Sequence, residues 1–317
     1  MDFEKQTGFK LINISDLAFI SYEQVGSKEK AWYQNTTTSK KYLYKKNRSP
    51  GEDWAEILAF ELAKRLNIPC ANYFFAYDEL NKTKGIVTEP VQDEDDTLIL
   101  GNQLLVEATQ KPGSEADAES FVVKTEEQTV DRVVDIMTNE IKHKPKQFDS
   151  LPGIKTALDF FIGYVLFDAL IANQDRHHQN WAYIVTNKGT KHLSPTFDHA
   201  SSMAFNLSDE ERSIRMNSKD QGQQIETFVK RAKSHFYLDN KRLKTYEAFA
   251  AFRLYAPTAT KSWLNKLEAL TPDIIENLVS SMPTCRMSQT TKQFTTKLLL
   301  CNRSRILEQI NTEIESS

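Results

Sequence analysis

Glycine is scarce in this sequence, which has ten glycines among 317 residues. They form neither a Gly-x-Gly-x-x-Gly pattern nor a Walker pattern, so the two standard glycine-rich loops that hold nucleotide phosphates are absent. A protein that binds a nucleotide without these loops needs other phosphate contacts, such as a lysine, a bound cation or a short turn with exposed N–H groups.

Cysteine is also rare. The three cysteines, Cys70, Cys285 and Cys301, are odd in number, far apart and set among apolar or helical residues. We therefore expect no disulfide framework, and none of the three has the spacing of a zinc site or a nucleophile motif. They are interpreted as free thiols in a reducing compartment.

Long apolar runs are missing as well. The closest candidate for a membrane span, residues 157–171, is interrupted by Asp159 and Asp168, and the first five residues contain no apolar signal region. We therefore predict a cytoplasmic protein that does not enter a membrane. The net charge of −3 gives no reason to expect direct binding to nucleic acid.

A polar segment at residues 173–181, Asn-Gln-Asp-Arg-His-His-Gln-Asn-Trp, is the most informative part of the chain. Asp175 and Asn180 have the Asp-x4-Asn spacing of kinase catalytic loops, and Asp198 follows after two short expected strands. A carboxylate can orient an attacking hydroxyl, and carboxylate and amide oxygens suit Mg²⁺. An isolated match would equally fit a polar turn. With its context, the order predicts phosphoryl transfer.

That context is a buried helix followed by strands. Residues 155–172 are apolar on almost every side, which predicts a helix in the core directly before the loop. Residues 182–185 and 192–196 are predicted as strands that lead on to Asp198. A loop that emerges from a rigid core element can hold functional side chains accurately.

The first ninety residues are predicted as a small β-rich lobe with one helix. The expected strands are residues 18–22, 31–33, 41–45, 73–77 and 85–88. Ser49 and Glu52 form a Ser-x-x-Glu pattern, which predicts a capping box and a helix that continues to about Asn67.

Lys45 ends one of these strands, and Glu56 lies one turn into the helix that follows. A strand lysine and a helix glutamate can form the ion pair that aligns nucleotide phosphates. Taken separately, Lys45 fits equally well as one member of the solvated basic run at residues 40–48. The downstream loop favours the functional interpretation, because the two signals agree.

A short turn at residues 25–30, Val-Gly-Ser-Lys-Glu-Lys, lies between two expected strands. A single glycine permits a tight turn there, and its backbone N–H groups could face an anion. This turn is the best candidate for a loop that covers the phosphates.

The rest of the chain is predicted as a larger, mainly helical lobe. Helical periodicity is found near residues 130–141, 227–236, 241–255, 274–279 and 288–314, and residues 109–127 are interpreted as a loop or insertion. The predicted fold is therefore α+β and bilobal. Residues 1–90 form the N-lobe, residues 91–317 form the C-lobe, and the nucleotide is expected in the cleft between them.

Five segments in this order carry a specific resemblance. They are Gly26-Ser27-Lys28-Glu29-Lys30, Tyr42-Leu43-Tyr44-Lys45, Gly51-Glu52-Asp53-Trp54-Ala55-Glu56, residues 173–181 and Phe197-Asp198-His199-Ala200-Ser201-Ser202. Together they resemble the HipA-like serine/threonine kinase family, over roughly residues 15–210. The most specific part is Asp-Arg-His-x-x-Asn-Trp. The resemblance implies a bacterial, protein-kinase-like bilobal fold that uses ATP and Mg²⁺.

The resemblance also implies roles for individual residues. In the polar segment and after it, Asp175 is implied as the catalytic base, His177 as a loop residue on the nucleotide side, and Asn180 and Asp198 as magnesium ligands. In the N-lobe, Lys45 is implied as the phosphate-binding lysine beside Glu56, and the phosphate loop is implied to contain Gly26, Ser27 and Lys30. The segment from Glu89 to Val91 is implied as the hinge that meets adenine. Pro90 removes one backbone donor from this hinge.

Substrates and partners are implied by the same resemblance. Several family members are toxins of toxin–antitoxin systems that phosphorylate aminoacyl-tRNA synthetases, and others are stand-alone or host-directed kinases. We therefore expect a protein substrate phosphorylated on serine or threonine, for instance an aminoacyl-tRNA synthetase, and an antitoxin-like partner. Some members autophosphorylate a serine in the phosphate loop, and Ser27 is the nearest candidate here.

Three other interpretations stay open. The same fold could transfer phosphate to a small molecule or a lipid headgroup, because sequence determines phosphate handling more firmly than acceptor choice. The histidines at 177, 178, 192 and 199 could indicate a metal hydrolase, although the adjacent pair lacks the spacing of a zinc site. A pseudokinase is the third alternative, against which the complete set of Lys45, Asp175, Asn180 and Asp198 argues.

Overall fold

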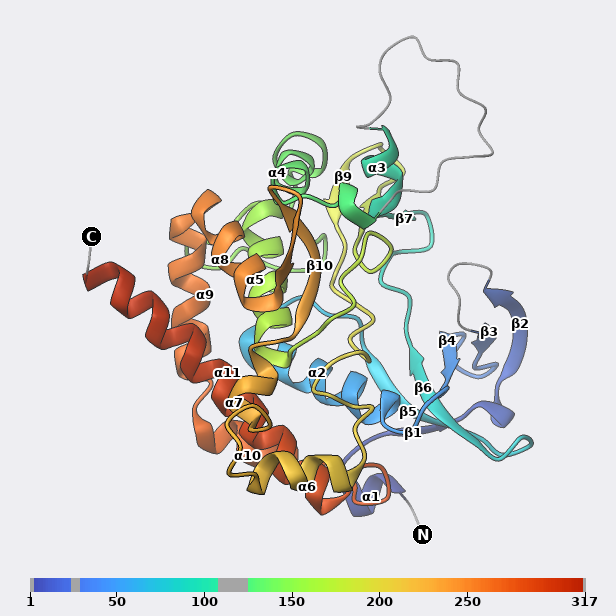
Figure 1. Cartoon of the computed structure of the whole chain (residues 1–317). Coiled ribbons are helices and arrows are strands. Elements are labelled where there is room, and N and C mark those ends of the chain that lie inside the picture. Colours follow the sequence, from blue (N-terminus) through green and yellow to red (C-terminus); the bar gives the residue numbers. More distant parts are fainter. Residues whose placement is uncertain (1–2, 24–28, 108–124, 316–317) are drawn as a thin grey trace.

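The computed structural model describes residues 3–23, 29–107 and 125–315 (Figure 1). The protein has the expected α+β architecture, with a β-rich N-terminal part and a mainly helical C-terminal part. In Figure 1 the six-stranded sheet lies at the lower right, and helices α8, α9 and α11 lie to the left around α5.

The elements of the N-terminal part, in chain order, are α1 Phe3–Thr7, β1 Leu11–Asn13, η1 Ile14–Asp16, β2 Ala18–Glu23, β3 Lys30–Gln34, β4 Lys41–Lys46, α2 Glu52–Leu66, β5 Tyr73–Asp78 and β6 Thr83–Thr88. Those that follow are β7 Thr97–Leu100, α3 Gly101–Glu107, η2 Thr125–Glu127, α4 Val130–Asp135, η3 Ile136–Ile141, α5 Ala157–Ile171, β8 Ala182–Val185, β9 Lys191–Leu193, α6 Asp209–Asn217, α7 Ile225–Val229, β10 Lys233–Leu238, β11 Lys241–Lys244, α8 Thr245–Phe252, η4 Arg253–Tyr255, α9 Pro257–Ala269, α10 Pro272–Ser281 and α11 Gln289–Glu315.

All five strands predicted in the first ninety residues are present in one six-stranded sheet. Its order is β1-β5-β6-β4-β3-β2, with β1 and β5 parallel and the other neighbours antiparallel. In β4, Tyr42 and Tyr44 are buried on one face, and Lys45 points to the other face, where it is also buried. The alternation of β4 therefore brings a lysine to the inner face of the sheet.

The predicted capping box at Ser49 is wrong. Helix α2 begins at Glu52 with Gly51 as its N-cap, and no side-chain cap bond is present. Gly51 has φ 102°, a left-handed conformation that other residues rarely adopt, so the chain enters the helix through a glycine turn. The carboxylate of Glu52 instead accepts a hydrogen bond from the backbone N–H of Arg48 at 2.9 Å.

Helix α5 is the buried helix that the sequence predicts. Thr156 caps it, with a capping box in which Asp159 is the reciprocal partner. Thirteen of its fifteen residues are buried, so the helix is surrounded by protein. It ends at Ala172, whose left-handed φ of 51° turns the chain sharply into the polar loop. The loop is therefore attached directly to a helix that is buried in the core.

Gly163 in α5 gives a test of this packing. An added Cβ would lie 2.5 Å from Cε2 of Trp263 on α9, which is closer than carbon atoms approach. Gly163→Ala should therefore destabilise the protein by about 1–2 kcal/mol, because overpacking outweighs the better helix propensity of alanine, which is worth about 1 kcal/mol. Urea unfolding of this variant and of Gly163→Ala/Trp263→Phe measures the effect. The double variant should recover part of the loss, and a stabilised single variant would contradict the contact.

The helical stretches predicted at 227–236 and 241–255 are wrong in part, because each also contains a strand. Residues 233–238 and 241–244 form the antiparallel hairpin β10–β11. In β10, Ser234 and Phe236 are buried between more exposed neighbours, which is a period of two rather than of a helix. Asp239 and Asn240 have φ values of 49° and 60°, the conformation of a tight hairpin turn that Asp and Asn tolerate.

The buried apolar side chains form one large cluster that extends across the position predicted as the lobe boundary. It includes Trp54 and Leu58 of α2, Phe161 of α5 and Trp263 of α9. A smaller cluster of buried side chains is formed mainly by residues of the sheet strands and includes Tyr42. The division at residue 90 stays a prediction. Among the described residues, no helix combines the length and apolar character needed to cross a bilayer.

Candidate active site

A cavity of about 510 Å³ lies between the sheet and the polar loop that follows α5. Strands β3 and β4, the segment after β6, and the loop and its continuation to Asp198 all contribute to its wall. Eight of the residues predicted as functional line it, namely Lys30, Lys45, Glu89, Val91, Asp175, His177, Asn180 and Asp198. Gly26 and Ser27 lie outside the described residues. A cavity of this size suits a nucleotide-sized ligand.

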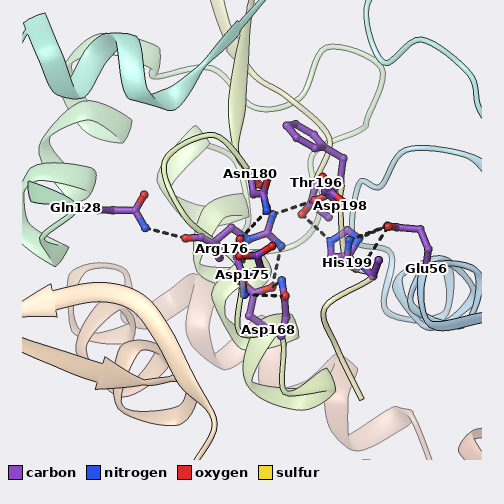
Figure 2. A network of polar contacts seen from close by, with 12 residues as sticks. Glu56, Gln128, Asp168, Asp175, Arg176, Asn180, Thr196, Asp198 and His199 are labelled. Carbon is purple, nitrogen blue, oxygen red and sulfur yellow. Dashed lines mark hydrogen bonds and ion pairs between the residues drawn. The ribbon is translucent and has the colours of Figure 1, made fainter. Parts of the chain in front are cut away.

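A buried ion pair holds the loop on helix α5 (Figure 2). The guanidinium of Arg176 donates to both carboxylate oxygens of Asp168, at 2.8 Å each, and both side chains are almost fully buried. Arg176 also donates to the backbone oxygen of Asn180 at 2.7 Å, and the side chain of Asn173 donates to Asp168 at 2.8 Å. Each polar group of the pair is thus satisfied, as a buried pair requires.

The two ends of the loop are joined by a second set of contacts. The amide nitrogen of Asn180 donates to the backbone oxygen of Asp175 at 2.6 Å. Gln128 donates to the backbone oxygen of Arg176 at 2.8 Å and accepts from the indole N–H of Trp181 at 3.1 Å. The loop is therefore held by contacts within the protein itself.

Asp175 is the most exposed carboxylate of this group, with 43% of its side chain accessible. One of its oxygens, Oδ2, accepts from the hydroxyl of Ser201 at 3.4 Å. The other, Oδ1, lies 3.8 Å from Nε2 of His177, whose Nδ1 accepts from the backbone N–H of Gln179 at 3.1 Å. Asp175 is thus an accessible carboxylate whose orientation is set by hydrogen bonds, as a general base requires.

Lys45 forms an ion pair with Asp198, with Nζ and Oδ1 3.5 Å apart. Burial lowers the pKa of the Lys45 ammonium, but the carboxylates of Asp198 and Glu56 outweigh it, so the net shift of the pKa is upward. The lysine is therefore charged at neutral pH. Asp198 has a left-handed φ of 59°, and its backbone N–H donates to the hydroxyl of Tyr73 at 3.1 Å.

Glu56 does not form the predicted ion pair with Lys45 in this structure. It is fully buried, and its carboxylate accepts from the backbone N–H groups of His199 and Ala200, at 2.7 and 3.1 Å. Nδ1 of His199 lies 3.2 Å from the same carboxylate. Because backbone donors satisfy Glu56, the ammonium of Lys45 pairs with Asp198 instead. Helix α2 is thereby connected to the segment that carries Asp198.

The predicted hinge lies at the edge of the cavity. The carboxylate of Glu89 accepts from Lys40 at 3.0 Å and from Asn72 at 3.1 Å, so it is directed to surface partners. Its backbone N–H has a long contact of 3.4 Å with the oxygen of Asn72, and Pro90 has no N–H. Of these three hinge residues, Val91 is therefore the one whose backbone N–H is best suited to donate a hydrogen bond to a ligand.

The donor set at the cavity suits magnesium better than zinc. Asn180 and Asp198 offer an amide and a carboxylate oxygen, and Mg²⁺ is commonly held by one or two such groups together with substrate phosphates. Among the described residues, no group of three or more His, Cys, Asp or Glu side chains is placed to hold a metal ion.

Several residues that shape the site are not predicted from the sequence to do so. Trp32 and Glu23 line the cavity from β3 and β2, with the indole N–H donating to Glu23 at 2.9 Å. Asp168, Gln128 and His199 hold the loop and Asp198 from separate parts of the chain. Only tertiary structure brings them to the site. Two clues are available in the sequence: Asp168 is a charged residue inside an otherwise apolar helix, and His199 directly follows Asp198 in a segment that carries the family resemblance.

Comparisons with known proteins agree with this fold. Residues 145–263 match the family model of the HipA-like C-terminal domain. No curated protein sequence gives a significant match. The structure is similar to that of the Helicobacter pylori proinflammatory kinase CtkA, with 15% sequence identity, coverage of 96% of this chain and 98% of the other, and a TM-score of 0.68.

A second similar structure is HipA from the toxin–antitoxin system of Shewanella oneidensis MR-1, solved with HipB and its operator DNA. It is 14% identical, with coverage of 92% of this chain and a TM-score of 0.51, and this chain spans 64% of its length. These matches share the fold described above, and the family match contains the polar loop and Asp198. Residues 145–263 therefore match a HipA-like C-terminal domain, and the chain as a whole shares its fold with these two solved structures.

Proposed function

We propose that this protein is an ATP- and Mg²⁺-dependent kinase that phosphorylates serine or threonine hydroxyls of a protein. The observation that carries the proposal is that Lys45, from strand β4, lines one cavity together with Asp175, Asn180 and Asp198, which follow it by 130 residues or more in the sequence. A lysine, two oxygen ligands and an accessible carboxylate are what phosphoryl transfer needs from a protein.

Each residue has a role that follows from its surroundings. The buried ammonium of Lys45 binds phosphate oxygens, and Asn180 and Asp198 hold the metal ion. Mg²⁺–ATP, when bound, supplies the phosphoryl group, with the cation balancing the phosphate charge. Asp175 orients the acceptor hydroxyl and takes its proton. At the hinge, Val91 offers its backbone N–H to the adenine ring of ATP.

Incubation with γ-labelled ATP and Mg²⁺ tests the proposal. Label should appear on a protein band, either that of an added substrate or that of the chain itself. Label confined to a soluble metabolite or a lipid would show that the acceptor is a small molecule or headgroup. Stoichiometric zinc by elemental analysis, together with no ATP-induced thermal shift, would favour the histidine-based hydrolase.

Asp198→Asn should weaken the binding of Mg²⁺–ATP by about tenfold, because it replaces a charged ligand by a neutral one. Calorimetric titration with ATP in Mg²⁺ and then in EDTA measures the effect. The loss should be confined to the Mg²⁺ titration, since without the cation Asp198 contributes no metal bond, and asparagine retains an oxygen that can accept from the ammonium of Lys45. The exposed Asp149 provides a matched control, Asp149→Asn, with unchanged affinity in both. An equal Mg²⁺ dependence in Asp198→Asn and in the unaltered protein would exclude Asp198 as a ligand.

The protein partner is a further part of the proposal. The Shewanella HipA structure contains HipB, and the similarity of fold supports a search for an antitoxin-like partner of this chain. Co-expression with small DNA-binding proteins encoded beside it, followed by co-purification, tests for such a partner. An aminoacyl-tRNA synthetase is the first protein substrate to add to the labelling reaction.

A further inference from the structure

His235 faces Asp175 from outside the polar loop. It belongs to strand β10, and its Nε2 lies 3.9 Å from Oδ1 of Asp175. Nε2 of His177 lies 3.8 Å from the same oxygen, and the rings of His177 and His235 meet edge to face with centroids 5.6 Å apart. Two imidazole rings therefore flank one oxygen of the proposed base.

The position of His235 is fixed by hydrogen bonds between the hairpin and the loop. Gln128 donates from the same amide nitrogen to the backbone oxygens of Arg176 and His235, at 2.8 and 3.1 Å. The backbone N–H of Lys233 donates to the side chain of Gln174 at 3.2 Å. These hydrogen bonds hold the β10–β11 hairpin in a fixed position relative to the polar loop at residues 173–181.

His235 is not part of the wall of the nucleotide-sized cavity. Asp175 and His177 line that cavity, whereas His235 does not, and 20% of its side chain is accessible. The imidazole thus approaches the carboxylate of Asp175 from outside the space assigned to the nucleotide. An acceptor must reach Asp175 from outside that space as well.

We infer that His235 binds the acceptor hydroxyl, with its Nε2–H donating to the acceptor oxygen while that hydroxyl donates to Oδ1 of Asp175. An oxygen about 2.8 Å from each atom fits between two atoms 3.9 Å apart. This inference rests on the proposed function. In the transfer step, the acceptor oxygen bonds to the γ-phosphorus, the bond from that phosphorus to the bridging oxygen breaks with its electron pair leaving on ADP, and the hydroxyl proton passes to Asp175.

The surroundings of His235 favour the required tautomer. Its Nδ1 is buried without a hydrogen-bond partner among the described residues, so a proton there would be an unsatisfied donor and is better placed on Nε2. Burial lowers the pKa of His235 to about 4, with Arg242 of β11 and the histidines at 177 and 178 acting in the same direction. The ring is therefore a neutral donor near pH 7.

Two substitutions separate acceptor binding from packing. His235→Leu removes the donor, and His235→Gln retains an N–H close to the position of Nε2. His235→Leu should lower kcat/KM for the protein acceptor about tenfold, with the Kd of ATP unchanged, and His235→Gln should recover most of the loss. If kcat/KM fell equally in both variants, or if the Kd of ATP rose in His235→Leu, His235 would only pack the hairpin. The exposed His143 gives the control His143→Leu, which should match the unaltered protein.

A second measurement does not depend on activity. Nitrogen-15 NMR of the histidine rings, with His235 assigned by the signal missing in His235→Gln, should show a neutral ring protonated on Nε2 from pH 6 to pH 8. Its resonances should move in Asp175→Asn. A His235 protonated on Nδ1, or one that titrates near pH 6.5, would overturn the inference even if the protein is an active kinase. Conversely, a protein that transfers no phosphate but has the expected His235 spectrum would contradict the proposed function alone.

Discussion

Asp175→Asn should lower the rate of phosphoryl transfer by about 10²–10⁴-fold, the range that a general base contributes. Asparagine has nearly the same shape and retains an oxygen for the hydroxyl of Ser201, which lies 3.4 Å from Asp175, but it cannot take a proton. The contact of Asp175 with Asn180 is made by the backbone oxygen of Asp175, which the substitution leaves in place, so the Kd of Mg²⁺–ATP should stay within about twofold. The rate comes from initial-velocity labelling, and the affinity comes from calorimetric titration.

The control for this experiment is Asp149→Asn, which makes the same chemical change at an exposed residue away from the cavity. Its rate and affinity should both match those of the unaltered protein. If Asp175→Asn retained full turnover, Asp175 would not be the base. If rate and affinity fell together, the substitution would have disturbed the loop rather than the proton transfer.

Arg176→Ala should destabilise the protein by about 3–5 kcal/mol, because it leaves the carboxylate of Asp168 buried without its partner. Both side chains of the pair are almost fully buried, and Arg176 also donates to the backbone oxygens of Asn180 and Phe197. The same substitution therefore releases both the loop and the segment that ends at Asp198. Urea unfolding, followed by circular dichroism and by tryptophan fluorescence, measures the loss.

An exposed ion pair provides the contrast. Lys64 is 54% accessible and pairs with Glu61 on the surface of α2. Lys64→Ala should cost less than about 1 kcal/mol, because such pairs are screened by solvent. If Arg176→Ala were no more costly than Lys64→Ala, the Asp168 carboxylate would have to find water in the folded protein, and the pair could not be what holds the loop.

Much of the fold is predictable from local patterns. The alternation in β4 and the apolar surface of α5 each report burial directly, and both elements lie where the sequence predicts them. The order of Asp175, Asn180 and Asp198 is equally visible, because a loop places these residues close together in sequence as well as in space. Their chemical roles stay predictions.

The failures have physical causes. The β10–β11 hairpin is mistaken for helix because it lies between two helices, α7, which ends at Val229, and α8, which begins at Thr245, and the predicted helical stretches extend from each of them into the strands. Helix α2 begins at a glycine turn, although Ser49 offers a better capping pattern. Glu56 is the right type of residue near the right place, but its partners are backbone N–H groups, which carry no sequence signal.

The large cluster of buried side chains also limits how the chain can be divided. Helix α2 packs on strand β5 on one side and on α9 and α10 on another, so its apolar residues belong to one interior. A cut at residue 90 would expose Trp54 and Leu58 of α2 in the N-terminal fragment. The C-terminal fragment would lose α2, which covers part of its apolar surface. Proteolysis in the predicted hinge should therefore yield fragments that aggregate or stay associated, and recombinant work on this protein has to retain both halves together.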